Sequence, residues 1–244
     1  MYYINAMGIH GDMGLEIEII YSDAYLLVIN KPSGLLSIPD GYDPTLPHVR
    51  SLLESEWGRL YSLHRLDKET SGALILARDA DTHRTMNLLF DSRAIKKQYL
   101  CLVLGHPTWD NWDERTSLLV NGDRDHRTVA NFSKGKTART FFHVQKHLQG
   151  VDLLKAELFS GLTHQIRAHS SHLGFPILFD PLYTRSIYKS SMQTYEALLA
   201  GSGYQKRLML HAFQLTFTHP VTSQPIVVSI PPPSDFACLV DLLK

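Results

Sequence analysis

The 244-residue sequence predicts an α+β protein with a mixed, mainly antiparallel central sheet and flanking helices and loops. Three observations lead to this prediction. Short β-rich segments are grouped along the chain, the connections between them are short, and only a few segments have helical character. Since no composition shift or linker divides the chain, we expect a single domain over residues 1–244.

The first strands are expected near the N-terminus. Residues 15–20 and 24–30 are β-rich runs separated by three residues, which predicts a hairpin or two adjacent strands. Residues 31–44 are dense in Pro, Gly, Ser and Asp and therefore predict a loop. A helix is expected over residues 46–57.

A buried strand, a helix and a second strand are expected in the middle of the chain. Residues 72–78 form a short apolar run after a turn, which is typical of a buried strand. Residues 79–92 place Leu, Met and Phe at roughly helical spacing behind an initial Asp, which predicts a helix. Residues 97–105 predict another strand, and residues 106–136 are polar and rich in turn-forming residues.

A hairpin and a helix are expected next. Residues 138–147 and 151–159 alternate on either side of a Gly-containing turn and predict a pair of strands. Residues 163–174 predict a helix, in which Thr163 caps the first turn and Gly174 takes a left-handed conformation after the last turn.

The C-terminal part returns to strands. Residues 209–220 and 225–230 predict two late strands, and residues 231–243 predict a short closing helix. Strands are thus grouped along the chain with only a few helices between them, which is the α+β pattern rather than that of alternating βαβ units.

Charge is balanced overall but unevenly distributed. The formal net charge is +0, which excludes a uniformly basic nucleic-acid binder. Residues 1–24 carry a net charge of −4, whereas residues 124–146 carry six Lys or Arg against one Asp, a net +5. The basic segment is compatible with a phosphate-binding surface and equally with a solvated loop and strand edge.

The composition favours a cytoplasmic protein without membrane association. Cys101 and Cys238 both lie in apolar runs, so we expect two buried, unpaired cysteines in a reducing compartment. No apolar run approaches the length of a membrane span, and the N-terminus lacks the pattern of a secretion signal.

Three histidines lie close together, at His164, His169 and His172. Zinc hydrolases place two His four residues apart with a Glu between them, whereas these spacings are five and three with no Glu or Cys nearby. We therefore expect no metal, although a hydrolase with a histidine-bound metal is one alternative. The sequence also lacks a phosphate-binding loop, a dinucleotide fingerprint and a nucleophile elbow.

Asp67 stands between two cations, Arg65 and Lys68, just after His64. Neighbouring positive charge favours the ionised carboxylate, which can act as a nucleophile or a base, including at an anomeric carbon. Glycoside hydrolysis usually needs two carboxylates, and the only other one nearby is Glu69. A single carboxylate favours chemistry that keeps both halves of a glycoside bound. The other interpretation is an exposed Asp in a charged turn.

Five segments in order resemble motifs of the RluA-like pseudouridine synthases. The first three are NKPSGLLSIP at 30–39, HRLDKETSGALIL at 64–76 and KKQYLCLVLGHP at 96–107. The other two are SGLTHQIRAHSSHLGFPILFDPLY at 160–183 and LMLHAFQLTFTHP at 208–220. The resemblance extends from about residue 15 to residue 235. It implies the pseudouridine synthase fold and isomerisation of uridine to pseudouridine within RNA, without a cofactor.

The resemblance also implies roles for individual residues. Asp67 matches the catalytic aspartate, which attacks C1′ or assists deprotonation at the ribose. Tyr99 matches the tyrosine that packs under the uracil, and Arg167 matches the arginine that pairs with the catalytic aspartate. Arg65 is expected to fill the space left by the flipped uridine, because a stacked base is out of reach. The expected RNA contacts are Arg65, His64, Lys97, His164, Gln165 and His169.

Two departures from the family pattern concern RNA binding. Leu162 stands where the family has an Arg, and Phe179 stands where it has a Gly. They leave open an alternative, a non-catalytic RNA-binding or RNA-remodelling protein on the same fold. The expected partner is ribosomal or transfer RNA, the expected state is a monomer, and no separate N-terminal RNA-binding domain is expected.

Overall fold

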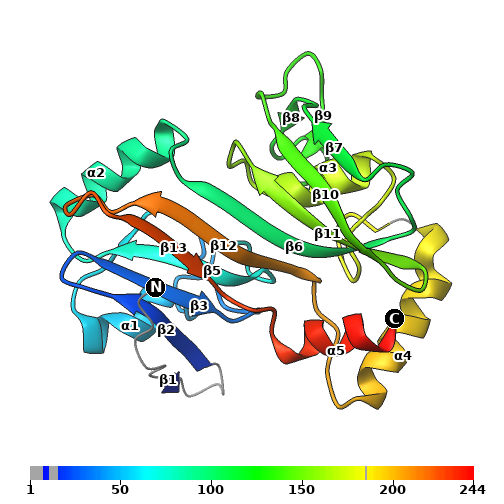
Figure 1. The fold of residues 1–244 in the computed structure, drawn as a ribbon, viewed down its shortest axis with the longest axis horizontal. Coiled ribbons are helices and arrows are strands. Elements are labelled where there is room, and N and C mark those ends of the chain that lie inside the picture. The colour runs from blue at the N-terminus through cyan, green and yellow to red at the C-terminus, as the bar shows by residue number, and fades with distance from the viewer. Residues whose placement is uncertain (1–7, 11–15, 185) are drawn as a thin grey trace. The chain divides into compact units, whose positions relative to one another are not determined.

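The computed structural model describes residues 8–10, 16–184 and 186–244. It divides into two compact units (Figure 1). Unit 1 is formed by Met1–Lys97 and Ala212–Pro231, and unit 2 by Gln98–His211 and Pro232–Lys244. The single domain expected over the whole chain stays a prediction, and each unit is described by itself.

Unit 1 contains a mainly antiparallel group of strands. Along the sheet, β1, β2, β3, β5 and β12 follow one another, while β4 pairs with β5 and β13 with β12. These strands are β1 (Gly8–His10), β2 (Glu16–Ser22), β3 (Leu26–Lys31), β4 (Tyr61–Ser62), β5 (Ser71–Ala77), β12 (Leu210–Thr218) and β13 (Pro225–Ser229). The antiparallel pairing of β2 with β3 confirms the predicted N-terminal hairpin, except for residue 15, which lies outside the described residues.

Strand β5 is the core of unit 1. All seven of its residues, Ser71–Ala77, are buried, and β3 pairs with it from Leu26↔Ala77 to Lys31↔Gly72. A strand with neighbours on both edges and both faces covered needs a continuous apolar sequence. The prediction of a buried strand is therefore confirmed.

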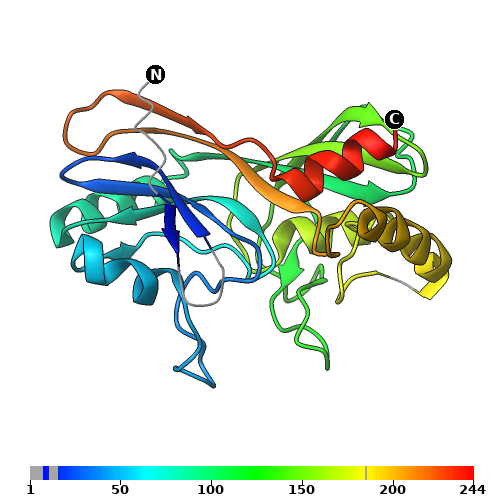
Figure 2. The same ribbon diagram turned by 90° about the horizontal axis from the view of Figure 1, so that it is seen from below.

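Two helices, α1 (Val49–Trp57) and α2 (Ala80–Asp91), belong to unit 1. Figure 2 shows both on the same side of the strands of this unit. Asp79 caps α2, since its side chain accepts a hydrogen bond from the Thr82 N–H at 2.8 Å. Both predicted helices are confirmed, and α1 begins three residues later than the sequence suggested.

Unit 2 is built around a long hairpin. Strands β10 (Thr140–His147) and β11 (Val151–Leu158) pair antiparallel, which confirms the predicted hairpin. Strand β6 (Lys96–Leu104) confirms the strand predicted at 97–105. Strand β7 (Asn111–Glu114) pairs with β10 and lies in a segment that had been interpreted as turns. Two short strands, β8 (Leu118–Leu119) and β9 (Val129–Ala130), form a separate ribbon.

Three α-helices of unit 2 are described, α3 (Gln165–His172), α4 (Lys189–Gly201) and α5 (Ser234–Leu242). Helices α3 and α5 confirm predicted helices. Helix α4, which packs against α5 and follows a short 3₁₀ turn at Ser186–Tyr188, had no counterpart in the sequence analysis. Within the part of the chain that the structure describes, we find no helix with the length and apolar character of a membrane span.

The arrangement of helices and mainly antiparallel strands confirms the α+β prediction. The two cysteines are unpaired, as expected, and Cys101 is buried. Burial raises the pKa of the Cys101 thiol to about 12. Cys238 is partly exposed rather than buried, because it lies on the closing helix α5.

Candidate active site

Asp67 lies in the loop between β4 and β5 of unit 1. Its backbone carbonyl accepts a hydrogen bond from the Thr70 N–H at 3.0 Å, which closes a turn just before β5 begins. The Asp67 residue is half-buried and Arg65 is exposed. The turn therefore holds the carboxylate at the edge of the buried strand, where it can be reached from solvent.

The loop at residues 31–37 holds this turn through a buried lysine. Lys31 is 0% exposed, and its Nζ donates to the carbonyl oxygens of Pro32 at 2.8 Å, Leu35 at 2.8 Å and Lys68 at 3.1 Å. An ammonium group has three donors and is costly to bury without partners. Lys31 therefore ties the two loops together.

Lys31 was not among the predicted site residues. The signal that could have found it is a lysine at the end of an apolar strand, inside the first of the five motifs. A lysine that continues a buried run needs internal partners, because lysine is almost never fully buried without them.

Two serines of the same loop complete the connection. Ser37 Oγ donates to the Leu66 carbonyl at 2.8 Å and accepts from the Leu66 N–H at 3.0 Å. Ser33 Oγ donates to the Glu69 carbonyl at 2.8 Å. The residues on both sides of Asp67 are thus fixed through their backbone, which leaves the Asp67 position well defined.

His64 anchors the start of this loop to β5. Its Nε2 accepts a hydrogen bond from the Ile75 N–H at 3.0 Å, and its ring lies 5.2 Å from that of Phe90. Burial, with a smaller contribution from Lys97, lowers the pKa of His64 from 6.5 to about 3. The ring is therefore neutral and acts as an acceptor. These contacts give His64 a structural role, and its expected RNA contact stays a prediction.

Gly72 allows close packing at the start of β5. Its φ is +111°, and a Cβ atom there would lie 2.3 Å from the Ala212 carbonyl oxygen. No side chain fits at this distance, so the motif needs a glycine for both conformation and space. The neighbouring Thr70 hydroxyl is buried and forms no hydrogen bond within the described residues.

Lys97 and Tyr99 lie two residues apart on β6 but fall in units 1 and 2, respectively. Tyr99 is buried, with 7% exposure. The Lys97 Nζ lies 5.8 Å from the centre of the Phe90 ring, and burial, with a smaller contribution from Arg93, lowers the Lys97 pKa. The roles of both residues stay predictions.

Arg167 lies on α3 in unit 2 and is buried rather than displayed on the helix surface. Its guanidinium donates from Nε to Asp180 Oδ2 at 2.8 Å and from Nη2 to Asp180 Oδ1 at 2.9 Å. It also lies over the Tyr183 ring, 5.2 Å from the ring centre. The planar guanidinium of Arg167 and the planar carboxylate of Asp180 match in shape and charge, so the Arg167 side chain is held in one orientation.

Tyr183 extends this network to the loop at residue 128. Its hydroxyl accepts from the Thr128 N–H at 2.8 Å and donates to the Thr128 carbonyl at 3.1 Å. Burial raises the pKa of Tyr183 to about 12, so the donating proton is retained. Asp180 and Tyr183 lie within the fourth of the five motifs, and neither was predicted to have a role of its own.

The start of α3 differs from the predicted cap. The capping position is His164, not Thr163, and its φ of 57° and ψ of 20° place it in the left-handed region. The expected Thr163 cap is therefore wrong. Gln165 instead reaches back, since its Oε1 accepts from the Leu162 N–H at 3.2 Å and its Nε2 donates to Thr140 Oγ1 at 3.0 Å. Gly174, at the other end, has the predicted left-handed conformation with a φ of +92°.

His169 is buried within α3 and has an internal partner on each ring nitrogen. Nδ1 lies 2.9 Å from Thr140 Oγ1, and Nε2 lies 2.9 Å from the Thr116 carbonyl oxygen. Burial lowers the pKa of His169. Both His169 and Gln165 thus join α3 to β10, and their expected contacts with RNA stay predictions.

The two departures from the family pattern have local explanations. Leu162 packs against the apolar cluster formed by Leu118, Ala138, Ala168 and Tyr183. Phe179 keeps the left-handed backbone that a glycine would adopt, with a φ of 61°, while its side chain is buried. Neither change disturbs the Arg167–Asp180 pair.

Comparison with known proteins agrees with these motifs. The family described as RNA pseudouridylate synthase matches residues 25–172. The ribosomal large subunit pseudouridine synthase D of Zymomonas mobilis is 31% identical over 240 residues, which cover 94% of this chain and 73% of that protein. The dual-specificity RNA pseudouridine synthase RluA of Pasteurella multocida is 32% identical over 217 residues, covering 88% and 93%.

Solved structures share the fold. Human RNA pseudouridylate synthase domain containing 1 superimposes with a TM-score of 0.74 at 24% identity, covering 96% of this chain and 90% of that one. Human RNA pseudouridylate synthase domain containing 4 superimposes with a TM-score of 0.71 at 23% identity, covering 91% of each chain. The matched motifs, the sequence relatives and the shared fold together show that the chain belongs to the RNA pseudouridylate synthase family and is an isomerase that converts uridine in RNA to pseudouridine.

Proposed function

We propose that this enzyme modifies specific uridines of ribosomal or transfer RNA, with Asp67 as the catalytic aspartate and without a cofactor. The observation that carries the proposal is the turn at Asp67, whose backbone carbonyls on both sides accept hydrogen bonds from side chains of the 31–37 loop. A fixed carboxylate is ready to react without reorganisation. The relatives support RNA as the substrate, since one is named as a ribosomal large subunit pseudouridine synthase and the other as a dual-specificity RNA pseudouridine synthase.

The proposed reaction needs one carboxylate. The glycosidic C1′–N1 bond breaks, the uracil turns while bound, and C1′ bonds to C5, from which a proton is lost while N1 gains one. Asp67 acts at the ribose, either by attack on C1′ or by assisting deprotonation. Both halves of the nucleoside stay on the enzyme, so no activated water is required.

Tyr99 and Arg167 are proposed as the other two catalytic residues. Their support is the match of each residue to its family motif, together with the burial of both side chains. A buried tyrosine offers a flat apolar surface to a uracil ring. A buried arginine offers a fixed positive charge, and the two hydrogen bonds to Asp180 restrict its orientation.

Base flipping is proposed for access to the uridine. A base within a stack cannot reach a carboxylate, and extrusion costs a few kcal/mol. Arg65 is exposed next to Asp67 and is the proposed group that fills the space left behind. Splayed bases in single-stranded loops reduce this cost, so we propose such loops as the target.

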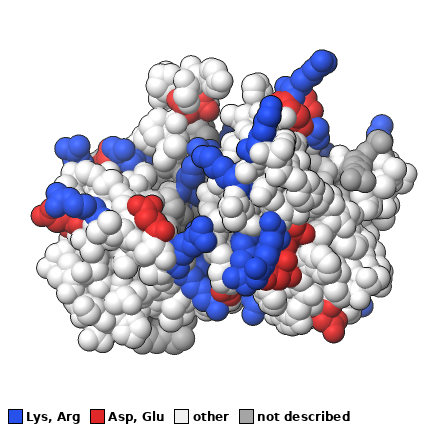
Figure 3. All heavy atoms as spheres, turned by 90° about the horizontal axis from the view of Figure 1, so that it is seen from above, with Lys and Arg blue, Asp and Glu red and all other residues white. Residues whose placement is uncertain are grey.

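The loop at residues 121–137, here named the basic loop, is a proposed contact for phosphates. Arg124, Lys134 and Lys136 are exposed there and form no ion pair within the described residues. Arg127 differs, because its Nε lies 2.7 Å from Asp123 Oδ2. In the view of Figure 3, several of the visible Lys and Arg side chains have Asp or Glu beside them. The unpaired cations are available to bind RNA phosphates, and this binding would release counterions from the RNA.

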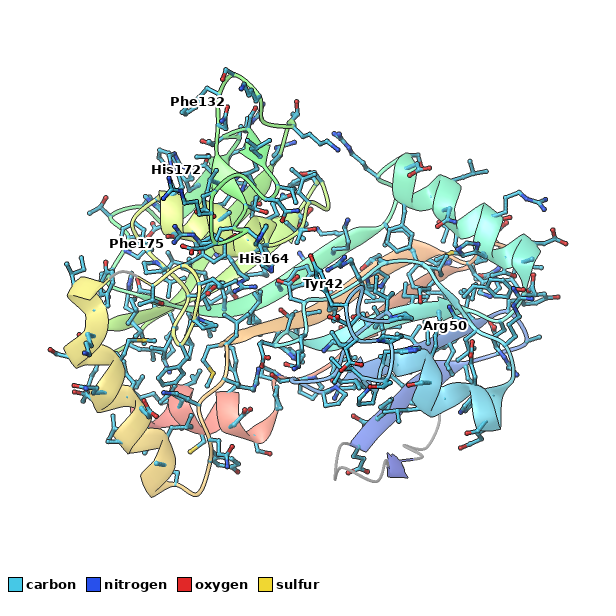
Figure 4. The ribbon with its side chains drawn as sticks, turned by 180° about the vertical axis from the view of Figure 1, so that it is seen from behind. Tyr42, Arg50, Phe132, His164, His172 and Phe175 are labelled. Atoms are coloured by element: carbon cyan, nitrogen blue, oxygen red, sulfur yellow. The ribbon has the colours of Figure 1, made fainter. Side chains whose placement is uncertain are left out.

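Phe132 is the proposed stacking residue of the basic loop. It is 81% exposed, and its ring lies 6.5 Å from that of His172. Figure 4 shows it near the tip of the loop. The turn beneath it is rigid, since Asn131 Oδ1 accepts from the N–H groups of Ser133 at 3.1 Å and Lys134 at 2.8 Å. An exposed aromatic ring among cations is a suitable platform for an unpaired base.

Release of tritium from RNA labelled with 5-³H-uridine tests the proposal. The wild type is compared with Asp67→Asn and with Glu69→Gln, a matched control two residues away. We expect release from transcribed ribosomal or transfer RNA by the wild type and the control, and none by Asp67→Asn. Release by Asp67→Asn at the wild-type rate would contradict the role of Asp67.

The same assay addresses the non-catalytic alternative. That alternative rests on Leu162 and Phe179, and both side chains pack locally while the buried Arg167–Asp180 pair is present. If folded wild-type protein binds these RNAs but releases no tritium from them, the proposed substrates are wrong. The proposed monomer is tested separately by light scattering of the purified protein.

A further inference from the structure

A buried carboxylate between two exposed histidines lies in unit 2, apart in sequence from every residue assigned to catalysis. Asp152 has 0% side-chain exposure. Its Oδ1 lies 2.8 Å from His106 Nδ1, and its Oδ2 lies 2.9 Å from His147 Nδ1. The two imidazoles are 51% and 61% exposed, respectively.

The backbone brings these three residues together. His147 and Asp152 are direct partners across the β10–β11 hairpin. His106 follows β6, and the preceding Gly105 N–H donates to the Gly150 carbonyl at 3.0 Å, at the turn of the same hairpin. The donor atoms therefore come from three segments whose relative positions are set by main-chain hydrogen bonds.

The Asp152 carboxylate needs a nearby cation. A buried ionised carboxylate is costly unless it is paired or coordinates a metal. The two imidazoles donate hydrogen bonds and bring a charge only when they are protonated. A divalent ion would supply the charge, and neutral histidine nitrogens and a carboxylate oxygen are the ligands that zinc takes in proteins.

We propose that His106, His147 and Asp152 bind a divalent transition metal, with zinc as the natural ion. The three ligand atoms already lie within 4.8 Å of one another. Zinc–nitrogen distances of about 2.0–2.1 Å require ligand atoms within about 4 Å of one another. The exposed histidine side chains have room to move this far, while the buried carboxylate stays in place. Three protein ligands leave the fourth position open for water or a further ligand.

This site shares no residue with the proposed catalytic set or with the histidines of α3. The bound ion would join the end of β6 to the β10–β11 hairpin and so stabilise this end of unit 2. Because metal binds only the folded arrangement, zinc should raise the melting temperature. The proposal does not require zinc for isomerisation.

Calorimetric titration of zinc into untagged, chelator-treated protein tests the site. The wild type is compared with the double variant His106→Ala/His147→Ala and with His143→Ala. His143 is a matched control, since it is an exposed histidine on β10 that pairs with Asn111 at 2.7 Å. We expect one zinc per chain in the wild type and the control, and at least tenfold weaker binding in the double variant. Because this change removes two hydrogen-bond partners from the buried Asp152 carboxylate, the folding of the variant is checked by circular dichroism, and Asp152→Asn is titrated beside it and should also bind zinc at least tenfold more weakly.

Two further measurements sharpen the outcome. Cobalt added in place of zinc should give a visible absorption spectrum with the wild type and not with the double variant. Zinc should raise the melting temperature of the wild type and the control only. Equal zinc binding by the wild type, the double variant and the control would place the zinc elsewhere on the chain, which has 13 histidines in total, and would overturn the proposal. So would the absence of stoichiometric binding to the wild type.

Discussion

Arg167 and Asp180 form a buried ion pair with two parallel hydrogen bonds, at 2.8 Å and 2.9 Å. The side chains are 4% and 0% exposed. Asp180 also accepts from the N–H groups of Leu182 at 2.9 Å and Tyr183 at 3.1 Å. The Asp180 carboxylate thus orients the predicted catalytic arginine, and it also closes the turn that follows Asp180 in the chain.

Replacement of Asp180 by Ala should destabilise the protein strongly. The change leaves a buried guanidinium without this partner, which costs about 3–5 kcal/mol in comparable cases. Urea denaturation measures the loss. Asp81→Ala serves as control, because Asp81 pairs with Arg84 at 3.3 Å on the surface, and the free energy of unfolding should hardly change. Similar losses of unfolding free energy in both variants would show that burial does not set the contribution of the Arg167–Asp180 pair to stability.

Gly72→Ala should be more damaging than Gly34→Ala. Both glycines have a positive φ, +111° and +89°, but an added Cβ meets the Ala212 backbone only at Gly72. We expect a cost of about 1–2 kcal/mol at Gly34 from the backbone conformation and about 2–5 kcal/mol at Gly72, where steric overlap is added. Thermal denaturation of the two variants checks this order. Equal losses of stability in the two variants would mean that the backbone conformation alone explains why position 72 needs a glycine.

Acid should destabilise the protein through His64. The folded state keeps its ring neutral to about pH 3, whereas the unfolded chain takes up the proton near its ordinary value of 6.5. The unfolded state therefore binds an extra proton between these values, and stability falls as the pH drops from 6.5 towards 3. The slope from one such group approaches about 1.4 kcal/mol per pH unit.

His64→Gln separates this contribution from those of other groups. Gln keeps an acceptor for the Ile75 N–H and does not titrate. Unfolding free energies measured between pH 7 and pH 5 should fall less steeply in this variant than in the wild type. His143→Gln, at an exposed site, should follow the wild type. If His64→Gln retains the full wild-type slope, the acid sensitivity arises elsewhere, for example at buried His169.

Phe132→Ala should weaken RNA binding without affecting the fold. Loss of one stacking platform costs about 1–3 kcal/mol, or roughly 5- to 150-fold in affinity. Fluorescence anisotropy with a substrate RNA loop at fixed salt gives the measurement. Ile187→Ala is the control, since Ile187 is 75% exposed and lies outside the basic loop. Unchanged affinity in Phe132→Ala would exclude stacking at this position.

Local sequence was sufficient for most elements of the fold. The apolar run of β5, the β10–β11 hairpin and the capped helix α2 were predicted because their side-chain patterns match the period of the element they form. The Asp67 motif was recognisable for a related reason. Its residues are adjacent in the chain, so their spacing is visible without a structure.

Other elements depend on contacts that the local pattern does not contain. Strand β7 is a polar segment that became a strand because β10 offers it a free edge, with Trp112 opposite Phe142. Helix α4 has only Tyr195 and Leu199 buried and no side-chain cap, so neither its pattern nor its start was distinctive. Its packing against α5 comes from tertiary structure.

The sequence by itself determined the fold class, the family and the candidate catalytic residues, because these follow from short-range patterns and motifs. Only the tertiary structure revealed that Lys31 is buried against the Asp67 loop, that Asp180 holds Arg167, and that Asp152 lies between two histidines. In each case a charged group pairs with atoms distant in the chain. Burial decides the strength of such pairs, and burial is a property of the folded molecule.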